Sequence, residues 1–332
     1  MIKLLDCTLR DGGYINDWRF GATAISDISS KLIDSNVDII ELGFLKNEPP
    51  NKDRTVFNSV KQIIPLIDKT RNNTLYAAMI DVQGRIPIDM VEPYSSEGID
   101  IIRVIVWKRL LDEDFDYCKK IVEKGYKLCV QPARVDQYSE EEFVSMIHKF
   151  EALNPLAIYV VDSWGTLDLE KFSNYLKLIE ENLNTNISIG YHGHNNMQQA
   201  FGFAQWMLSQ PHRHNIIIDA SIYGIGRGAG NLSTETIAHY LNNKFNFKYN
   251  INNFIFLYEK YIKNIYDVFS WGYSIPLFIT AMEKCNPEYG VFCQKNNLSE
   301  KKCLEVIKML QGENRIRYNK NLITELVKEV KK

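Results

Sequence analysis

The sequence predicts an α/β fold, a closed (β/α)8 TIM barrel followed by a C-terminal helical extension. Short apolar runs typical of buried parallel strands alternate with amphipathic stretches typical of helices. Eight such units in about 240 residues fit a closed barrel, and no Gly-x-Gly-x-x-Gly pattern of an open nucleotide-binding sheet follows the first strand. The alternation stops near residue 250, so we expect a barrel over residues 1–245 and a helical domain over residues 246–332.

Eight apolar runs mark the strands, and we expect a helix after each. The first run contains Leu4 and Leu5. The others lie at residues 37–44, 74–81, 100–106, 126–131, 156–162, 187–194 and 216–223. Stretches 21–35, 140–153 and 169–183 have apolar residues at helical spacing, and the last two begin near a Ser or Asp that can cap them.

The C-terminal tail carries a different pattern. Residues 254–273 are dense in aromatic side chains, and residues 299–310 and 321–330 are amphipathic, with Ser299 as an expected N-cap. A highly aromatic helix is more often a buried interface than an active-site wall. We therefore expect the tail to pack on the barrel or on another subunit, and the chain to form a homo-oligomer.

Composition limits the class of function. The chain has 332 residues, 45% hydrophobic and 24% charged, with a formal net charge of −2. The absence of a Lys/Arg block argues against nucleic acid or an anionic membrane as a principal partner. We find no signal-peptide pattern and no long apolar segment. The six cysteines are scattered without a Cys-x-x-Cys pair, which predicts reduced thiols and a cytoplasmic protein.

Polar residues follow nearly every predicted strand, at the barrel end where enzymes of this fold hold their active sites. Arg10 and Asp11 come first, where the strand gives way to a Gly-Gly turn. A guanidinium beside a carboxylate suits joint binding of a cation and an anionic oxygen; an ion-paired strand end is the simpler alternative. The other strand ends offer Glu41, Asp81, Arg103, Gln131, Asp162 and Ser163.

Two histidines complete this set. His192 and His194 are two apart on a strand, so both project to one face, and Asp11 can complete a 2-His-1-carboxylate metal site with them. A second pair, His212 and His214, lies in a loop before the last strand, at the barrel bottom, where we expect no metal. The Gly-rich loop 224–231 could bind a carboxylate or phosphate through its N–H groups, or be only a tight turn.

Three motifs together resemble a known superfamily. They are Asp6-x-Thr8-Leu9-Arg10-Asp11-Gly12, His192-Gly193-His194-Asn195 and the Gly-rich loop ending in Gly230-Asn231. They resemble the DRE-TIM metallolyases (HMGL-like proteins) over roughly residues 1–242. The resemblance implies carbon–carbon lyase chemistry with Mn²⁺ or Mg²⁺ held by Asp11, His192 and His194. It also implies Asn231 as a further ligand or supporting group, and Arg10 as the group that steadies an enolate oxygen.

Within the superfamily, the sequence most resembles 4-hydroxy-2-oxovalerate aldolase-like proteins. Gly13-Tyr14 follows the first motif instead of the pair usual in acyl-CoA synthases, and loop 224–231 lacks the cysteine of the acyl-CoA lyases. The resemblance implies cleavage of a 4-hydroxy-2-oxo acid to pyruvate and an aldehyde. Two alternatives stay open. One is an acyl-CoA-using lyase or Claisen-type synthase, and the other is a non-catalytic metal-bound scaffold whose aromatic tail binds a partner such as a dehydrogenase.

One position departs from the aldolase pattern. The acid/base histidine that those aldolases place three residues after the metal-binding Asp is Tyr14 here. We expect the proton to be moved by Tyr14, by Tyr273 in the tail segment Trp271-Gly-Tyr-Ser, or by a metal-bound water; Tyr14 could also only line the pocket. Three strand-end residues are expected to bind substrate, namely Arg103, Gln131 and Ser163.

Overall fold

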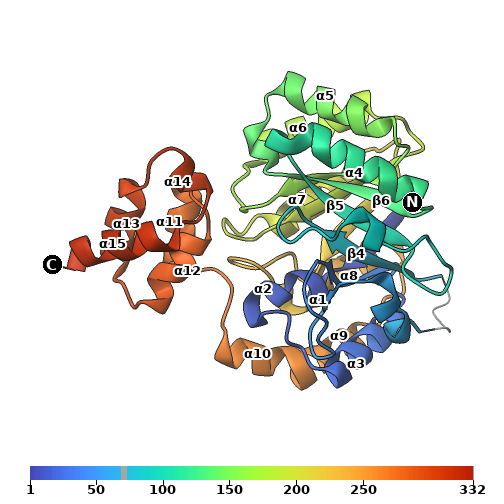
Figure 1. The fold of residues 1–332 in the computed structure, drawn as a ribbon, viewed down its shortest axis with the longest axis horizontal. Coiled ribbons are helices and arrows are strands. Elements are labelled where there is room, and N and C mark those ends of the chain that lie inside the picture. The colour runs from blue at the N-terminus through green and yellow to red at the C-terminus, as the bar shows by residue number, and fades with distance from the viewer. Residues whose placement is uncertain (69–72, 332) are drawn as a thin grey trace.

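The computed structural model describes residues 1–68 and 73–331, and within them eight parallel strands close into a barrel. β1 (Ile2–Asp6) pairs with both β9 (Ile216–Ala220) and β2 (Ile39–Leu45), which closes the ring. The remaining barrel strands are β4 (Leu75–Ile80), β5 (Ile101–Trp107), β6 (Lys127–Ala133), β7 (Ala157–Asp162) and β8 (Ser188–Gly193). A two-residue strand, β3 (Val56–Phe57), pairs with β2. The predicted barrel is confirmed (Figure 1).

Alternation along the strands separates an inner from an outer face. Side chains such as Ile39, Ile101 and Ile217 gather in an inner hydrophobic cluster, whereas their sequence neighbours pack under the helices. Charged residues two positions further along the same strands therefore also point into the barrel. These are Glu41, Arg103 and Asp219, all fully buried.

Six longer helices cover the outside of the barrel. They are α3 (Ala22–Ile33), α4 (Leu111–Glu123), α5 (Glu140–Glu151), α6 (Leu169–Asn182), α7 (Ala200–Ser209) and α8 (Thr234–Phe245), counted over the described residues. The expected caps are present. Ser139 and Glu142 form a reciprocal capping box at α5, and the Asp168 carboxylate accepts from the Lys171 N–H at 2.8 Å at α6.

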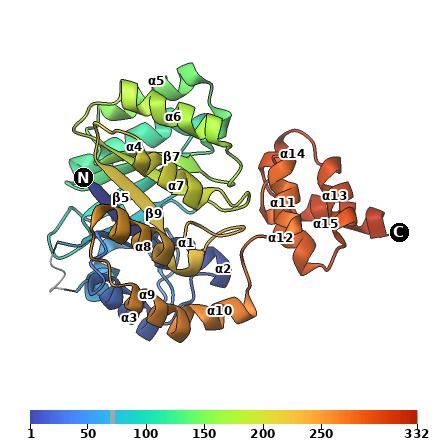
Figure 2. The same cartoon turned by 180° about the vertical axis from the view of Figure 1, so that it is seen from behind.

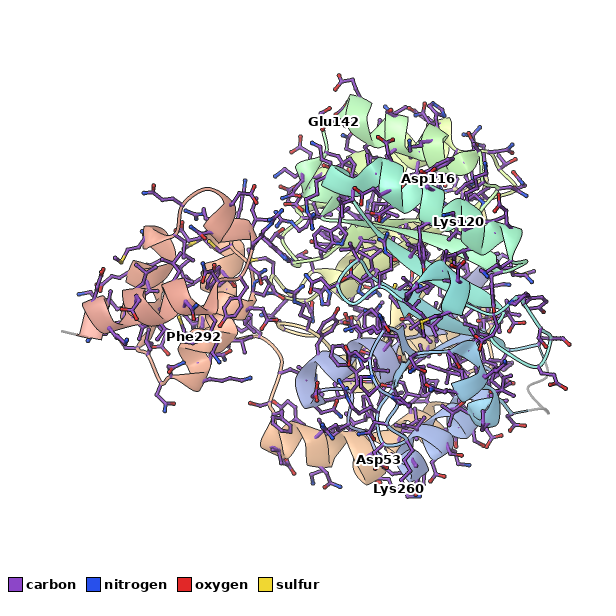
Figure 3. The ribbon with its side chains drawn as sticks, viewed as in Figure 1. Asp53, Asp116, Lys120, Glu142, Lys260 and Phe292 are labelled. Carbon is purple, nitrogen blue, oxygen red and sulfur yellow. The ribbon has the colours of Figure 1, made fainter. Side chains whose placement is uncertain are left out.

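The outer face of α4 is polar. Asp116 and Lys120 on α4 lie on the solvent side, as Figure 3 shows, while Cys118 and Ile121 on the same helix are buried. Among the described helices, none combines the length and apolarity needed to cross a bilayer.

The expectation of a helix after every strand is wrong for β2 and β4. In the described residues, β2 is followed by β3 and the 3₁₀ turns η1 (Val60–Gln62) and η2 (Ile64–Leu66), and β4 only by η3 (Ile88–Met90). Prolines explain the difference, since they remove helical hydrogen bonds. The two segments contain Pro49, Pro50, Pro65, Pro87 and Pro93. Further 3₁₀ turns are η4 (Lys108–Leu110), η5 (Val135–Gln137) and η6 (Ile222–Gly224).

The first strand ends at Asp6. Its carboxylate accepts from the Thr8 N–H at 2.9 Å and from the Thr234 hydroxyl at 2.6 Å, which turns the chain away from the sheet. Two short helical turns follow, α1 (Thr8–Asp11) and α2 (Gly13–Asn16). Gly13 is needed here, because a Cβ would lie 1.9 Å from the Trp18 ring. Arg10 and Asp11 therefore project from a helical turn at the barrel mouth.

The tail falls into two parts. α9 (Ile251–Leu257), the π-helical η7 (Tyr258–Ile262) and α10 (Lys263–Val268) share the hydrophobic cluster of the barrel. A separate cluster joins α11 (Ile275–Met282), α12 (Glu288–Lys295), α13 (Glu300–Met309) and α15 (Lys320–Lys331), and the short α14 (Glu313–Ile316) connects α13 to α15. Figures 1 and 2 both show this helical group beside the barrel, on the side of α2 and away from the N-terminus. The domain division at residue 245 and the homo-oligomer stay predictions.

A glycine inside the barrel provides a test of this packing. Gly190 lies in register with Tyr159, and a Cβ at residue 190 would come within 2.4 Å of that ring. We expect Gly190→Ala to lower the free energy of unfolding by about 1–3 kcal/mol through overpacking, measured by urea denaturation. Gly202→Ala is the control. Its Cβ would meet nothing within 4 Å on α7, so it should stabilise by about 0.5–1 kcal/mol. Equal stability of Gly190→Ala and wild type would contradict this packing.

Candidate metal and catalytic site

Three predicted metal ligands meet at the mouth of the barrel. The Nε2 atoms of His192 and His194 lie 3.4 and 3.9 Å from Oδ2 of Asp11. The two imidazole rings face the same side, with centroids 5.1 Å apart and planes at 87°. β8 thus supplies both histidines, and the helical turn α1 supplies the carboxylate. All three side chains are buried.

The electrostatics of this group separate the two histidines. Burial lowers the pKa of His194 to about 4, so its imidazole is neutral at pH 7. For His192, the effect of burial is outweighed by Asp11 and Asp219, which raise its pKa. Burial alone would raise the pKa of Asp11, but Arg10 and the histidines hold it well below its usual range. Asp11 is therefore a carboxylate and His194 a free electron-pair donor.

Several buried acceptors in this group make no hydrogen bond among the described residues, although the Arg10 guanidinium lies 3.1 Å from Oδ1 of Asp11. Neither oxygen of Asp11 has a hydrogen-bond partner, nor does Oδ1 of Asn231. The amide nitrogen of Asn231 is used, since it donates to the Ile225 carbonyl at 3.1 Å. The backbones of Asn231 and His194 pair in an isolated antiparallel β-bridge. Buried acceptors without donors are uncommon in proteins. Two imidazoles, a carboxylate and an amide oxygen thus fit a divalent cation.

Cys7 also lies in this group. A sulfur, carboxylate and imidazole atom of Cys7, Asp11 and His192 fall within 4.8 Å of one another, a buried arrangement that could hold a metal ion. However, the Cys7 thiol donates to the carbonyl of Ala220 at 3.2 Å, and burial raises its pKa well above normal. A protonated thiol is a poor metal ligand. Sequence reasoning counted Cys7 only among scattered thiols and missed its position.

A chain of ion pairs continues from Asp11 into the barrel. Arg10 lies 3.1 Å from Asp11 and 2.7 Å from Oε2 of Glu41. That same Glu41 oxygen lies 2.8 Å from Arg103, which also pairs with Asp219. Sequence reasoning noted Glu41 at a strand end but missed Asp219. The available signal was an acid inside the apolar run Ile216–Ala220, because a buried charge needs a partner.

The residues expected to bind substrate occupy three different environments. Gln131 is buried in β6, and alternation with the inner residue Cys129 points it into the barrel; its Nε2 has no hydrogen-bond partner among the described residues. Ser163 lies after β7, where its Oγ accepts from the Arg134 N–H at 2.9 Å. Arg103 lies deeper, between Glu41 and Asp219.

The two tyrosines expected to move a proton lie apart from each other in sequence and environment. Tyr14 on α2 packs edge-on against Trp18 and Phe44, with ring centroids 5.0 and 6.1 Å away. The residue as a whole is 38% exposed, yet burial of the phenol group raises the pKa of Tyr14 well above normal, although Arg227 and Arg10 oppose this change. Tyr273 lies between α10 and α11 and is 49% exposed. In the described residues it makes no hydrogen bond or ring contact.

The Gly-rich loop 224–231 connects the barrel mouth to the helical group α11–α15. Arg227 lies 3.2 Å from both Glu288 and Asn286 of that group. On its other side, the guanidinium lies 5.8 Å from the ring centroid of Tyr14. The loop therefore links α2 at the mouth with the start of α12.

The second histidine pair lies at the opposite end of the barrel, as expected, in the loop that leads into β9. His212 contacts Glu180 through Nδ1 and donates to the Met207 carbonyl through Nε2 at 2.6 Å. His214 donates to the Ile187 carbonyl at 2.8 Å. Protein groups thus occupy both nitrogens of His212.

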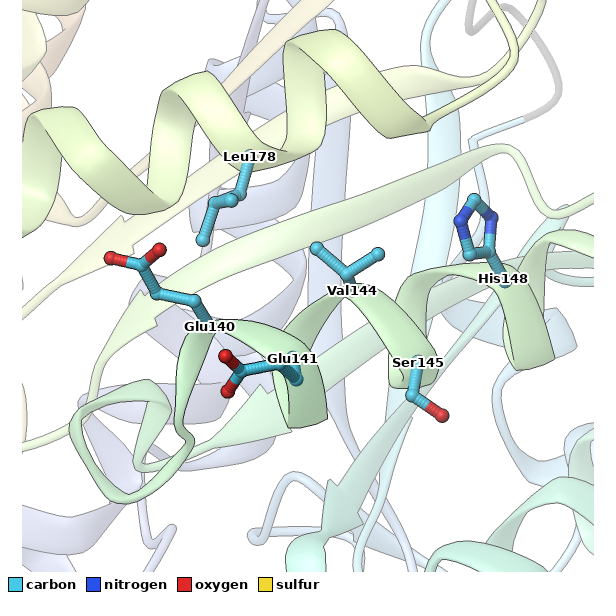
Figure 4. Close-up of a pocket in the computed structure, with 6 residues that line it drawn as sticks. All are labelled: Glu140, Glu141, Val144, Ser145, His148 and Leu178. Atoms are coloured by element: carbon cyan, nitrogen blue, oxygen red, sulfur yellow. The ribbon is translucent and has the colours of Figure 1, made fainter.

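A surface hollow lies elsewhere, on the outer helices α5 and α6 (Figure 4). Its wall contains Glu140, Glu141, Val144, Ser145, His148 and Leu178. It belongs to the outer helical layer and not to the strand ends, so it is separate from the group around Asp11.

Comparison with known proteins defines the family. The HMGL-like family model matches residues 1–256, and the chain belongs to this family. The predicted resemblance is confirmed. A 4-hydroxy-2-oxovalerate aldolase of Bacillus cereus is 23% identical over 239 residues, covering 71% of this chain and 68% of that protein. The oxaloacetate decarboxylase of Mycobacterium tuberculosis is 22% identical over 243 residues, covering 70% and 68%.

Solved structures are similar in fold. The N-terminal domain of a candidate aldolase from Bacteroides vulgatus superposes with a TM-score of 0.69 at 21% identity, covering 95% of this chain and 98% of that one. The carboxyl transferase domain of Rhizobium etli pyruvate carboxylase gives a TM-score of 0.71 at 14% identity, covering 99% and 60%. The likeness in fold extends beyond the barrel into the C-terminal helices.

The metal ligands can be tested by substitution. We expect His192→Ala and Asp11→Asn each to weaken Mn²⁺ binding at least ~10-fold, because the first removes a donor nitrogen and the second removes the negative charge of the carboxylate. Isothermal titration calorimetry measures the affinity directly. His212→Ala, a surface-loop control with the same chemical change, should leave Mn²⁺ affinity unchanged. If His212→Ala weakened binding as much as His192→Ala, the assignment of the two pairs would be wrong.

Proposed function

We propose that this chain is a divalent-metal-dependent aldolase that cleaves or forms a carbon–carbon bond through a pyruvate-type enolate. The substrate would be a 4-hydroxy-2-oxo acid, and the products pyruvate and an aldehyde. The observation that carries the proposal is the convergence of Asp11, His192 and His194 beside the Arg10 guanidinium. Membership of the HMGL-like family and similarity to 4-hydroxy-2-oxovalerate aldolases support it.

Asp11, His192 and His194 would hold Mn²⁺ or Mg²⁺, with the free Oδ1 of Asn231 as a further donor. The ion supplies Lewis-acid polarisation of the 2-oxo acid, which lowers the free energy of placing negative charge on its keto oxygen. Arg10 adds a charge-assisted hydrogen bond to that oxygen. Its ion pairs with Asp11 and Glu41 fix the guanidinium before substrate arrives. Gln131 and Ser163 are proposed to contact the substrate.

Tyr14 is proposed to handle the proton of the 4-hydroxyl group. Because burial raises the pKa of Tyr14, the neutral phenol dominates at pH 7. In the condensation direction, the enolate carbon attacks the aldehyde carbon, the carbonyl electron pair moves to oxygen, and the phenol donates its proton there. Cleavage is the reverse. The raised pKa favours the donor role over that of a free base.

Proton exchange tests the enolate step that aldol cleavage shares with decarboxylation of oxaloacetate. We expect the protein with Mn²⁺ to exchange the methyl protons of pyruvate with D₂O, and chelator-treated protein to lose this activity, as followed by ¹H NMR. Proton exchange together with cleavage of 4-hydroxy-2-oxo acids identifies an aldolase. Proton exchange together with decarboxylation of oxaloacetate, but without that cleavage, identifies a decarboxylase. Absence of exchange with either metal would rule out the enolate chemistry.

The proton route has its own test. We expect Tyr14→Phe to lower the kcat of aldol condensation between pyruvate and an aldehyde by ~10²-fold or more, the usual size of a lost acid/base group, with Mn²⁺ affinity unchanged. Pyruvate methyl exchange should persist, since that step does not use the 4-hydroxyl proton. Tyr273→Phe is the matched control, and a larger effect there would move the role to Tyr273. A near-wild-type rate for Tyr14→Phe would leave Tyr14 as part of the pocket wall.

A further inference from the structure

Six ionisable side chains form a closed ring inside the barrel mouth. In order around the ring they are Asp11, Arg10, Glu41, Arg103, Asp219 and His192. Each is within ion-pairing distance of the next, and the side chains of all six are at most 6% exposed. The ring joins the group that would steady the enolate oxygen, Arg10, to a proposed metal ligand, His192, by a route through Arg103.

The contact of His192 with this ring determines how its imidazole is turned. Nδ1 lies 3.0 Å from Oδ2 of Asp219, so a proton on Nδ1 is donated to that carboxylate. Nε2 then faces Asp11, where it can offer its electron pair to a cation. A hydrogen bond of this kind fixes the tautomer and orientation of metal-binding histidines.

Asp219 in turn depends on Arg103. The carboxylate is buried on β9, and Arg103 from β5 pairs with the same Oδ2 atom that faces His192. The Arg103 guanidinium also lies 2.8 Å from Glu41 and over the Tyr159 ring, 5.0 Å from its centroid. A planar guanidinium can bridge two carboxylates and stack on an aromatic ring at once, which a lysine ammonium cannot do.

We propose that Arg103 and Asp219 are positioning residues for the metal site. Through Asp219, Arg103 fixes His192 with its Nδ1 proton inward and its Nε2 toward Asp11. Through Glu41, the same guanidinium fixes Arg10. This inference rests on the proposed metal site, and it gives Arg103 a role other than direct substrate binding.

The two roles of Arg103 give different results in the absence of substrate. Substitution of a residue that only binds substrate changes KM and leaves the tautomer of the metal-free His192 imidazole and the metal affinity unchanged. Substitution of a positioning residue changes the His192 tautomer and the metal affinity before any substrate is added. Asp219, which contacts His192 directly, should show the same changes as Arg103.

The first measurement needs no variant. Long-range ¹H–¹⁵N NMR of ¹⁵N-histidine protein, with and without Mg²⁺, reports which ring nitrogen of His192 carries the proton; the signal is assigned by its loss in His192→Ala. We expect Nδ1 to be protonated in both states. A wild-type signal from an Nε2–H tautomer with a bare Nδ1 would overturn the proposal.

The second measurement uses Asp219→Asn and Arg103→Lys in the full chain. We expect each to weaken Mn²⁺ binding ~10-fold or more in the absence of substrate, and Asp219→Asn to lose the preference for Nδ1 protonation. Arg85→Lys is the matched control, because Arg85 pairs with buried Asp114 outside the ring. Folded variants with wild-type Mn²⁺ affinity and tautomer would overturn the proposal. If the variants show the expected changes but the wild-type protein fails the pyruvate exchange assay, the positioning role of the ring is supported and only the aldolase proposal is rejected.

Discussion

Charges buried inside a barrel have one another as their main partners, and this constraint governs the site. Glu41, Arg103 and Asp219 each lie on a different strand, and strand alternation points all three into the interior. A single buried ion costs several kcal/mol unless a partner and hydrogen bonds compensate it. Each member of the ring therefore requires its neighbours, so the strands must close in a register that brings them together. The functional geometry at the mouth follows from this requirement.

The parts of the site that follow from local rules could be predicted from sequence. His192 and His194 project to one side because strand residues alternate with a period of two, and the His212 pair lies at the far end because its loop precedes a strand. Asp219 could not be assigned a partner, since Arg103 is 116 residues away and nothing local connects them. The contact from Thr234 to Asp6 was equally beyond local rules, because the two residues are 228 positions apart in the chain.

Prediction of the fold from local sequence patterns had the same limit. Periodicity identified the eight barrel strands, but it assigned helices after β2 and β4, where prolines leave only 3₁₀ turns in the described residues. The environment of Tyr14 was equally beyond local rules. The tertiary structure places Arg227, from the Gly-rich loop after β9, 5.8 Å from the ring centroid of Tyr14. Burial nevertheless dominates and raises the pKa of Tyr14, which favours the role of proton donor in the proposed reaction.

Charge balance connects the ring to its ligands. Asp11, Glu41 and Asp219 carry three negative charges, and Arg10 and Arg103 carry two positive charges, so a neutral His192 leaves one negative charge in excess. In the metal-free protein, a proton on His192 can supply the balance, in keeping with the raised pKa of that imidazole. A divalent cation that replaces this proton leaves one positive charge in excess. In the proposed reaction, a 2-oxo acid would bring a single carboxylate that cancels this charge, so the ring, the cation and the substrate together would be neutral. A CoA thioester has no carboxylate next to its reacting carbonyl, and it would leave that charge uncompensated.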